Sequence, residues 1–93
     1  MLQLEKKHQQ IVQQILNKYP YRFHVYGSRA KGTARKLSDL DLCYQQNIPE
    51  STVFQIEEDF KESDLPFLVE LVNWKEMSSA FQELIKSDLI PLF

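Results

Sequence analysis

Short apolar runs typical of strands alternate along this chain with longer apolar stripes of helical period, and this alternation limits the folds available to it. Apolar residues three and four positions apart predict amphipathic helices near residues 4–19, 51–60 and 75–86. Branched and aromatic runs predict strands near residues 22–26, 40–44 and 67–72. A short helix is expected at 29–31, with Ser28 as its N-terminal cap and Gly32 as its stop. The fold class is therefore α/β (α+β), with about four helices on a small mixed three-stranded sheet.

The chain has 93 residues, which we expect to form a single domain spanning 1–93. The run FLVELV at 67–72 is almost continuously apolar, which favours a strand covered on both faces. No run approaches the roughly 18 apolar residues of a membrane span. One cysteine, Cys43, excludes an internal disulfide and a zinc site built from cysteines. We expect a cytoplasmic protein that does not associate with membranes.

Charge is distributed unevenly along the chain. The formal net charge is −2, so no overall positive field would attract nucleic acid, and no direct nucleic-acid binding is expected. Five cations nevertheless occur between Arg22 and Lys36 without an acid among them, and acids gather later, between Glu57 and Asp64. The basic stretch lies directly upstream of two aspartates, which suggests a site that binds both anions and cations.

Three carboxylates belong to the predicted strands. Asp39 and Asp41 are two residues apart, so both side chains leave the same face of one strand, about 7 Å apart at Cα. Glu70 lies in the middle of the last apolar run and would join them if the two strands are neighbours. Three clustered carboxylates repel one another, and a divalent cation removes that repulsion. Ligands that are all oxygen suit Mg²⁺ or Mn²⁺.

A phosphate-binding turn is expected where the first strand meets the short helix. Gly27 allows close approach of the backbone to a ligand, and a helix start offers free N–H groups. Ser28 adds a hydroxyl donor, and Arg29 and Lys31 lie nearest to the turn. Arg35 and Lys36 are interpreted as residues of a solvated loop. A phosphate site beside a pair of metal-binding acids indicates metal-assisted phosphoryl or nucleotidyl transfer.

These residues carry a resemblance to a known family. Gly27-Ser28 followed by Asp39-x-Asp41, within GSRAKGTARKLSDLDL, resembles the signature of the DNA polymerase β-type nucleotidyltransferase superfamily. More narrowly, the stretch is similar to the minimal nucleotidyltransferases, or MNT proteins. SDLPFLVELVNW resembles the strand of that family which carries its third acid. The resemblance covers about residues 22–85 and implies the polymerase β-like nucleotidyltransferase fold.

The resemblance also implies a function and its partners. MNT proteins are often paired with a HEPN-domain protein as a toxin–antitoxin module, so this chain would be the antitoxin, transferring AMP from ATP to a tyrosine of the HEPN toxin. Asp39, Asp41 and Glu70 would be the catalytic and metal-binding residues. Gly27 and Ser28 would bind the β- and γ-phosphates, with Arg29 and Lys31 as further phosphate-binding candidates. The implied cofactor is Mg²⁺ or Mn²⁺, and the implied substrate is ATP or another nucleoside triphosphate.

One departure from the family pattern leaves alternatives open. The third acid is usually aspartate, and here it is Glu70, whose side chain is one methylene longer. A second hypothesis is therefore a catalytically weak antitoxin that binds nucleotide and neutralises its partner by contact. A third is a subunit of a small-molecule nucleotidyltransferase of the aminoglycoside-modifying type. The apolar tail at 88–93 and the outer edge of the first helix are candidate partner surfaces.

Overall fold

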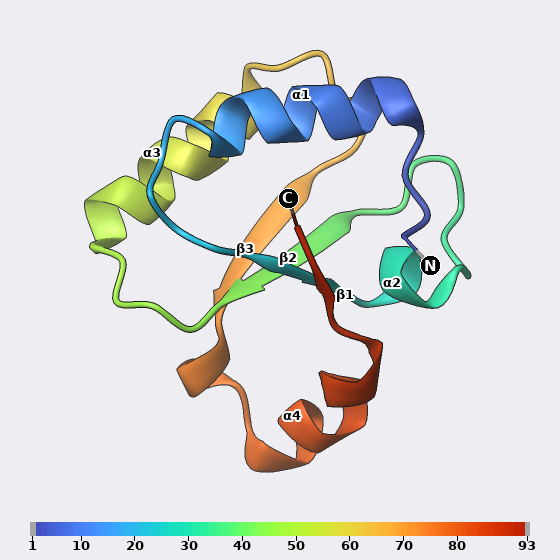
Figure 1. Cartoon of the computed structure of the whole chain (residues 1–93), viewed down its shortest axis with the longest axis vertical. Coiled ribbons are helices and arrows are strands. Elements are labelled where there is room, and N and C mark those ends of the chain that lie inside the picture. Colours follow the sequence, from blue (N-terminus) through green and yellow to red (C-terminus); the bar gives the residue numbers. More distant parts are fainter. Residues whose placement is uncertain (1, 93) are drawn as a thin grey trace.

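The computed structural model describes residues 2–92 of the chain, so Met1 and Phe93 lie outside the description. Helices and strands alternate, as predicted (Figure 1). The elements are α1 (Lys6–Leu16), β1 (His24–Tyr26), α2 (Ser28–Lys31), β2 (Leu40–Tyr44), α3 (Glu50–Lys61), β3 (Val69–Asn73), the 3₁₀ helix η1 (Trp74–Glu76), α4 (Ser79–Ile85), the 3₁₀ helix η2 (Lys86–Asp88) and β4 (Ile90–Pro91). Within residues 2–92, no helix is both long enough and apolar enough to cross a bilayer.

The strands form one mixed sheet in the order β3-β2-β1-β4. β1 is antiparallel to β2 and β4, and β2 is parallel to β3. The predicted mixed sheet is confirmed, but it has four strands rather than three. The additional strand, β4, comes from the apolar tail, where Ile90 pairs with Val25 and Leu92 is buried. The tail through Leu92 therefore contributes to the sheet and the core, and Phe93 lies outside the described residues.

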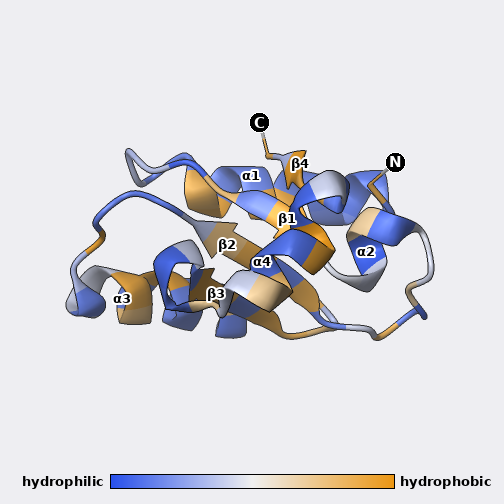
Figure 2. Cartoon of the chain, turned by 90° about the horizontal axis from the view of Figure 1, so that it is seen from below, coloured by the Kyte–Doolittle hydropathy of each residue, from blue (hydrophilic) through white to orange (hydrophobic). Residues whose placement is uncertain are grey.

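The two faces of the sheet are covered differently. On one face, α1 and α3 pack against Leu40, Leu42 and Tyr44, the alternate positions of β2. On the other, Ile85 of α4 packs with Tyr26 and Cys43. Figure 1 shows α1 and α4 on opposite sides of the strands. Figure 2 shows hydrophobic residues concentrated in the strands, whereas hydrophobic and hydrophilic residues alternate along the helices. The second face is covered by a smaller cluster, and this is the face that carries Asp41.

The last predicted strand lies at an edge of the sheet, which corrects the expectation that it is covered on both faces. Leu71 is buried beneath the helices, but Glu70 is exposed and Leu68, just before β3, is 61% exposed. The apolar run indicated the strand correctly. The run does not predict burial, because Leu68 is exposed and Val69 and Val72 are only half-buried.

Helix boundaries also differ from the predicted ones. α1 ends at Leu16, before Pro20, and its apolar stripe continues into the following turn. The last predicted helix is divided in two, because the side chain of Asn73 caps η1 and that of Ser78 accepts a hydrogen bond from the N–H of Phe81 at the start of α4. Two local caps thus interrupt what the apolar spacing alone indicates as one helix.

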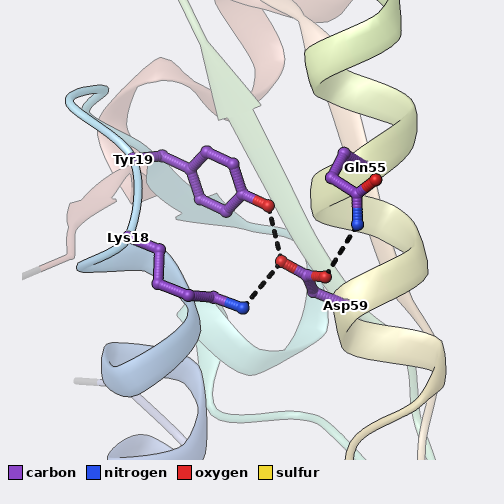
Figure 3. A network of polar contacts seen from close by, with 4 residues as sticks. All are labelled: Lys18, Tyr19, Gln55 and Asp59. Atoms are coloured by element: carbon purple, nitrogen blue, oxygen red, sulfur yellow. Dashed lines mark hydrogen bonds and ion pairs between the residues drawn. The ribbon is translucent and has the colours of Figure 1, made fainter.

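A polar network fixes the chain between α1 and β1 (Figure 3). The hydroxyl of Tyr19 donates to Oδ2 of Asp59 on α3 at 2.5 Å, and Nζ of Lys18 lies 3.0 Å from the same oxygen. Gln55 donates to the other carboxylate oxygen. The hydrogen bond to Asp59, followed by burial, raises the pKa of Tyr19 to about 12. The network ties the segment entering β1 to α3, which holds the covered face of the sheet together.

Candidate functional site

The turn after β1 has the conformation that its glycine permits. Gly27 has φ 77° and ψ −157°, a region that residues with a Cβ avoid, and α2 begins at the next residue, Ser28. The N–H groups of Ala30 and Lys31 both donate to the carbonyl of Gly27. Ser28 was expected to precede the helix as its cap, and it is instead the first helical residue. Gly32 ends α2 in the left-handed conformation, as expected.

The carboxylate of Asp41 lies directly against this turn. A Cβ added to Gly27 would lie 2.5 Å from Oδ2 of Asp41, which is closer than such atoms approach in proteins. The antiparallel register of β1 and β2 brings this about, since Tyr26 is the partner of Asp41. Glycine at position 27 therefore serves two purposes: it permits the backbone conformation and leaves room for the carboxylate.

Glu70 lies beside Asp41 on the next strand. The two residues are Cα partners in the parallel register of β2 and β3, so their side chains leave the same face of the sheet. Burial raises the pKa of Asp41 to about 6, with further increases from the charges of Glu70 and Asp39 and from hydrogen bonding with Glu70. The order across the sheet is thus Gly27 on β1's side, Asp41 in the middle and Glu70 on the outer side.

Asp39, like Glu70, is exposed at this site. It precedes β2 and is open to solvent, whereas Asp41 is half-buried. Its charge contributes to the raised pKa of Asp41, so the two carboxylates interact. Among residues 2–92, no three side chains of His, Cys, Asp or Glu are grouped closely enough to hold a metal ion. The structure therefore brings Asp41 and Glu70 together and leaves Asp39 beside them rather than in one compact triad.

The donor set nevertheless fits a hard divalent cation. Every candidate ligand is a carboxylate oxygen, which is the ligand type that Mg²⁺ and Mn²⁺ prefer. Asp41 is held in a position where its negative charge is disfavoured both by burial and by its neighbours. A bound cation would offset the unfavourable negative charge of Asp41, because it favours the charged forms of all three acids.

Arg29 makes contacts different from those expected of a phosphate ligand. It is only 5% exposed, and its guanidinium donates to the carbonyls of Ser38, Lys36 and Gln3. The guanidinium also lies 4.1 Å from the centre of the Phe67 ring. Burial lowers its pKa. Arg29 therefore joins the N-terminal segment, the loop before β2 and the segment before β3, and its donors are occupied by backbone carbonyls.

The remaining candidates from the basic stretch are exposed. Lys31 lies at the end of α2, open to solvent, and takes part in none of the ion pairs within residues 2–92. Arg35 and Lys36 line a small pocket with Gln3, Glu5 and His8, on the side of the N-terminal segment. Their position agrees with their interpretation as loop residues.

Two aromatic side chains near the site, Tyr26 and Phe67, were not among the predicted site residues. Tyr26 is buried opposite Asp41, and burial, together with the charges of Asp41, Glu70 and Cys43, raises its pKa to about 12. Phe67 forms the surface on which Arg29 lies. Neither role has a signal in the sequence. The position of Tyr26 beside Asp41 depends on the strand register, and the contact between Arg29 and Phe67 joins residues that are nearly forty positions apart.

Comparison with known proteins agrees with this geometry. Residues 6–93 match the family described as "Polymerase beta, Nucleotidyltransferase". The chain is 41% identical over 68 residues to a "Probable protein adenylyltransferase MntA" from Haemophilus influenzae, a match that covers 71% of this chain and 60% of that relative.

A solved structure has the same fold. It is described as "Crystal structure of the toxin-antitoxin with AMP-PNP", and it aligns with a TM-score of 0.68 at 18% identity, covering 91% of this chain and 72% of the other. With the family match extending over nearly all of the chain, this protein belongs to the polymerase β nucleotidyltransferase family.

Proposed function

We propose that this chain is a metal-dependent nucleotidyltransferase that acts as the antitoxin of a HEPN/MNT pair, transferring AMP from ATP to a tyrosine of its HEPN partner. The family supports nucleotidyl transfer as the reaction class. A relative named as a protein adenylyltransferase supports a protein as the acceptor. The fold of this chain resembles that of a chain in a toxin–antitoxin crystal structure, and this likeness supports the proposed pairing with a toxin.

One observation carries the proposal: a half-buried carboxylate, Asp41, lies between a glycine turn and a second carboxylate. Its pKa of about 6 means that the unliganded site holds a carboxyl group in an environment unfavourable to its charge. Such an arrangement lowers stability without benefit to the fold, and it is characteristic of functional sites. The contact with Gly27 adds that the turn is shaped around this carboxylate.

The residues have separate roles in the proposal. Asp39, Asp41 and Glu70 would hold Mg²⁺ or Mn²⁺, whose charge offsets that of the triphosphate. Gly27 and Ser28 would bind the β- and γ-phosphates through backbone N–H groups and the hydroxyl, and Lys31 would add a mobile positive charge. Glu70, the outermost acid, would accept the proton of the attacking hydroxyl. Arg29 is left out of the phosphate-binding set because carbonyls occupy its donors.

The proposal is tested with purified chain, its HEPN partner, ATP and Mg²⁺. The expected result is a partner heavier by one adenylyl group, with the modification mapped to a tyrosine by peptide mass spectrometry. The double variant Asp39→Asn/Asp41→Asn should abolish the mass increase, and Arg35→Gln, on the exposed loop, should retain it. An unmodified partner in the presence of bound ATP would refute transfer.

A second candidate function is favoured by Glu70 and by the open position of Asp39. An antitoxin that binds nucleotide and neutralises its partner by contact alone needs no compact metal triad, and none is formed within residues 2–92. Glu70→Asp separates the two functions. If this variant gains transfer activity that the natural chain lacks, the natural chain is the binding form. If both chains transfer AMP, the enzyme is established.

A further inference from the structure

The strand β3 has one free edge. It lies at the end of the sheet, with β2 on one side only. The N–H of Leu40 donates to the carbonyl of Leu68, so the main-chain groups of residue 68 and of every second residue after it point to β2. The N–H and C=O groups of Val69 and Leu71 therefore point away from the sheet, and no turn or loop within residues 2–92 forms a backbone hydrogen bond with either residue. Such an edge can accept one more strand.

Two pockets follow one another along this edge, on the side of the sheet that α3 covers. The larger, of about 510 Å³, is lined by residues 65–70, and the smaller, of about 280 Å³, by residues 71–73, each together with part of α3. The carboxylate of Asp41 leaves the opposite face of the sheet, so the pockets are separate from the proposed nucleotide site. We call the free edge of β3 and these two pockets the β3 edge surface.

Large apolar side chains are exposed at the β3 edge surface. Phe54 of α3 and Leu68, just before β3, are each 61% exposed, and Leu37 is 63% exposed. Apolar side chains that gather around a hollow, beside an unpaired strand edge, indicate a contact surface rather than scattered exposure. The apolar groups alone do not select an occupant, and the charges around them do.

The charges at the β3 edge surface are almost all negative. Glu57 lines both pockets, Glu50 and Glu76 line the smaller one, and Lys61 is the one cation in either lining. The three glutamates take part in none of the ion pairs within residues 2–92. Burial raises the pKa of Tyr44, and the charges of Glu76, Glu57 and Glu50 raise it further, so these acids act on one place. Their negative charge is therefore available to a partner.

This negative charge determines which kind of strand can add to the edge. A second copy of the chain would bring the same acids together across two paired β3 strands, and like charges on neighbouring strands oppose pairing. A basic segment would meet opposite charges instead. Arginine and lysine suit the pockets, because their aliphatic stems pack on apolar groups such as Phe54 while their charged ends reach carboxylates such as Glu57. Side chains at alternate positions of a strand share a face, so alternate cations would all point to α3.

We propose that the β3 edge surface binds an extended segment of a partner protein by strand addition, and that this segment carries arginine or lysine at alternate positions. Its main chain pairs with Val69 and Leu71, and its cations lie over the two pockets, near Glu57 and the neighbouring acids. Main-chain pairing supplies affinity, and the alternate cations supply specificity. The inference goes beyond the proposed function, because binding at this surface requires neither nucleotide nor transfer.

Two fluorescein-labelled peptides with blocked ends test the charge requirement: Ser-Arg-Val-Arg-Val-Arg-Ser and Ser-Glu-Val-Glu-Val-Glu-Ser. Fluorescence anisotropy with the full chain measures Kd for each. We expect the basic peptide to bind about tenfold tighter at roughly 50 mM salt, and the difference to shrink at roughly 300 mM salt because screening weakens exposed charge pairs. Equal affinity for the two peptides, or no binding of the basic one, overturns the proposal.

Two N-methylated forms of the basic peptide test strand addition itself, one methylated at the arginine amides and the other at the valine amides. Successive residues of a strand direct their N–H groups to opposite edges, so only one of the two sets can donate to β3. We expect one methylated peptide to lose binding and the other to retain it. Sensitivity at the arginines indicates antiparallel addition, and sensitivity at the valines indicates parallel addition. Equal binding of the two forms contradicts strand addition.

Matched variants of the chain locate the bound peptide. Glu57→Lys should weaken binding of the basic peptide by about tenfold, and Glu83→Lys, the same charge change on α4, should stay within about twofold of the natural chain. Phe54→Ala should weaken binding several-fold, whereas Leu84→Ala, at a similarly exposed leucine on α4, should not. Melting curves check that all four variants are folded. Binding of a fluorescent ATP analogue should be the same in all four.

Three further outcomes would overturn the β3 edge surface as the docking site. The first is peptide binding that neither Glu57→Lys nor Phe54→Ala weakens. The second is binding that Glu83→Lys or Leu84→Ala weakens instead, which would move the partner to α4. The third is a dimer in sedimentation velocity that Phe54→Ala dissociates, which would make a second copy of the chain the occupant.

Discussion

Gly27 combines a backbone conformation that other residues avoid with a carboxylate in the space of its missing side chain. We predict that Gly27→Ala lowers the melting temperature and abolishes nucleotide binding, because its Cβ must displace Asp41. Gly32→Ala is the matched control: its φ of 80° is also positive, but nothing lies within 4 Å of the added Cβ. Gly32→Ala should lose roughly 1 kcal/mol of stability and retain binding. Equal binding by both variants would show that the space at Gly27 is not needed.

Asp41 is expected to lower the stability of the chain in the absence of a cation. Its folded-state pKa of about 6 lies above the value of about 3.9 expected in the unfolded chain. The folded state therefore binds the proton more tightly, and the free energy of unfolding falls as pH rises from about 4 to about 6. Above that range the full cost of the buried charge remains.

Asp41→Asn should accordingly raise the melting temperature at pH 8 without divalent cations. A gain on the order of 1 kcal/mol corresponds to several degrees in a domain of this size. The gain should disappear at about pH 3, where Asp41 is protonated in both states. Asp39→Asn, at the exposed carboxyl, is the control and should change little. Scanning calorimetry at the two pH values measures both, and a destabilised Asp41→Asn variant at pH 8 would contradict the argument.

At the scale of elements, the side chain of Arg29, a residue of α2, connects segments that are separate in the sequence. Its guanidinium satisfies carbonyls on both sides of the site and lies on Phe67, which leads into β3. A lysine has one ammonium group and cannot reach the same set of acceptors. We predict that Arg29→Lys lowers the free energy of unfolding by roughly 2 kcal/mol, because buried acceptors lose their donors.

The same substitution elsewhere in the loop provides the control. Arg35→Lys changes an exposed side chain and should stay within about 0.5 kcal/mol of the natural chain. Urea unfolding monitored by the fluorescence of Trp74 measures both variants. If Arg29→Lys is as stable as Arg35→Lys, the guanidinium contacts do not hold the loop.

These elements also show what periodicity and spacing can predict. The stripes of α1 and α3 and the alternation of β2 have strong local signals, so their existence follows from the sequence. The resemblance selected Glu70, but its position beside Asp41 required the strand order, which no local pattern contains. β4 is two residues long and is specified by its pairing with Val25 rather than by its own composition. Arg29 looked like a free cation because its acceptors are backbone carbonyls, which are invisible in a sequence.

At the scale of the whole molecule, the sheet divides the chain into a face that confers stability and a face that carries the site. α1, α3 and the larger hydrophobic cluster cover one face, and the polar network at Asp59 ties that side together. The other face is covered in part by α4, which leaves Asp41 half-buried and Glu70 open at the edge. Stability can therefore be retained while the site carries an unfavourable charge, and a ligand that offsets this charge should be detected as added stability.

Ligand binding should accordingly raise the melting temperature in a way that depends on both metal and nucleotide. A ligand at 100 times its dissociation constant stabilises the folded state by about 2.7 kcal/mol. We predict that Mg²⁺ with ATP raises the melting temperature of the natural chain by several degrees, that ATP with a chelator raises it less, and that Asp41→Asn removes the metal-dependent part. Arg35→Gln should respond like the natural chain. A thermal shift series of the three chains, each with ATP and Mg²⁺ and with ATP and a chelator, tests the prediction. An equal rise with and without Mg²⁺ would show that nucleotide binds independently of the carboxylates.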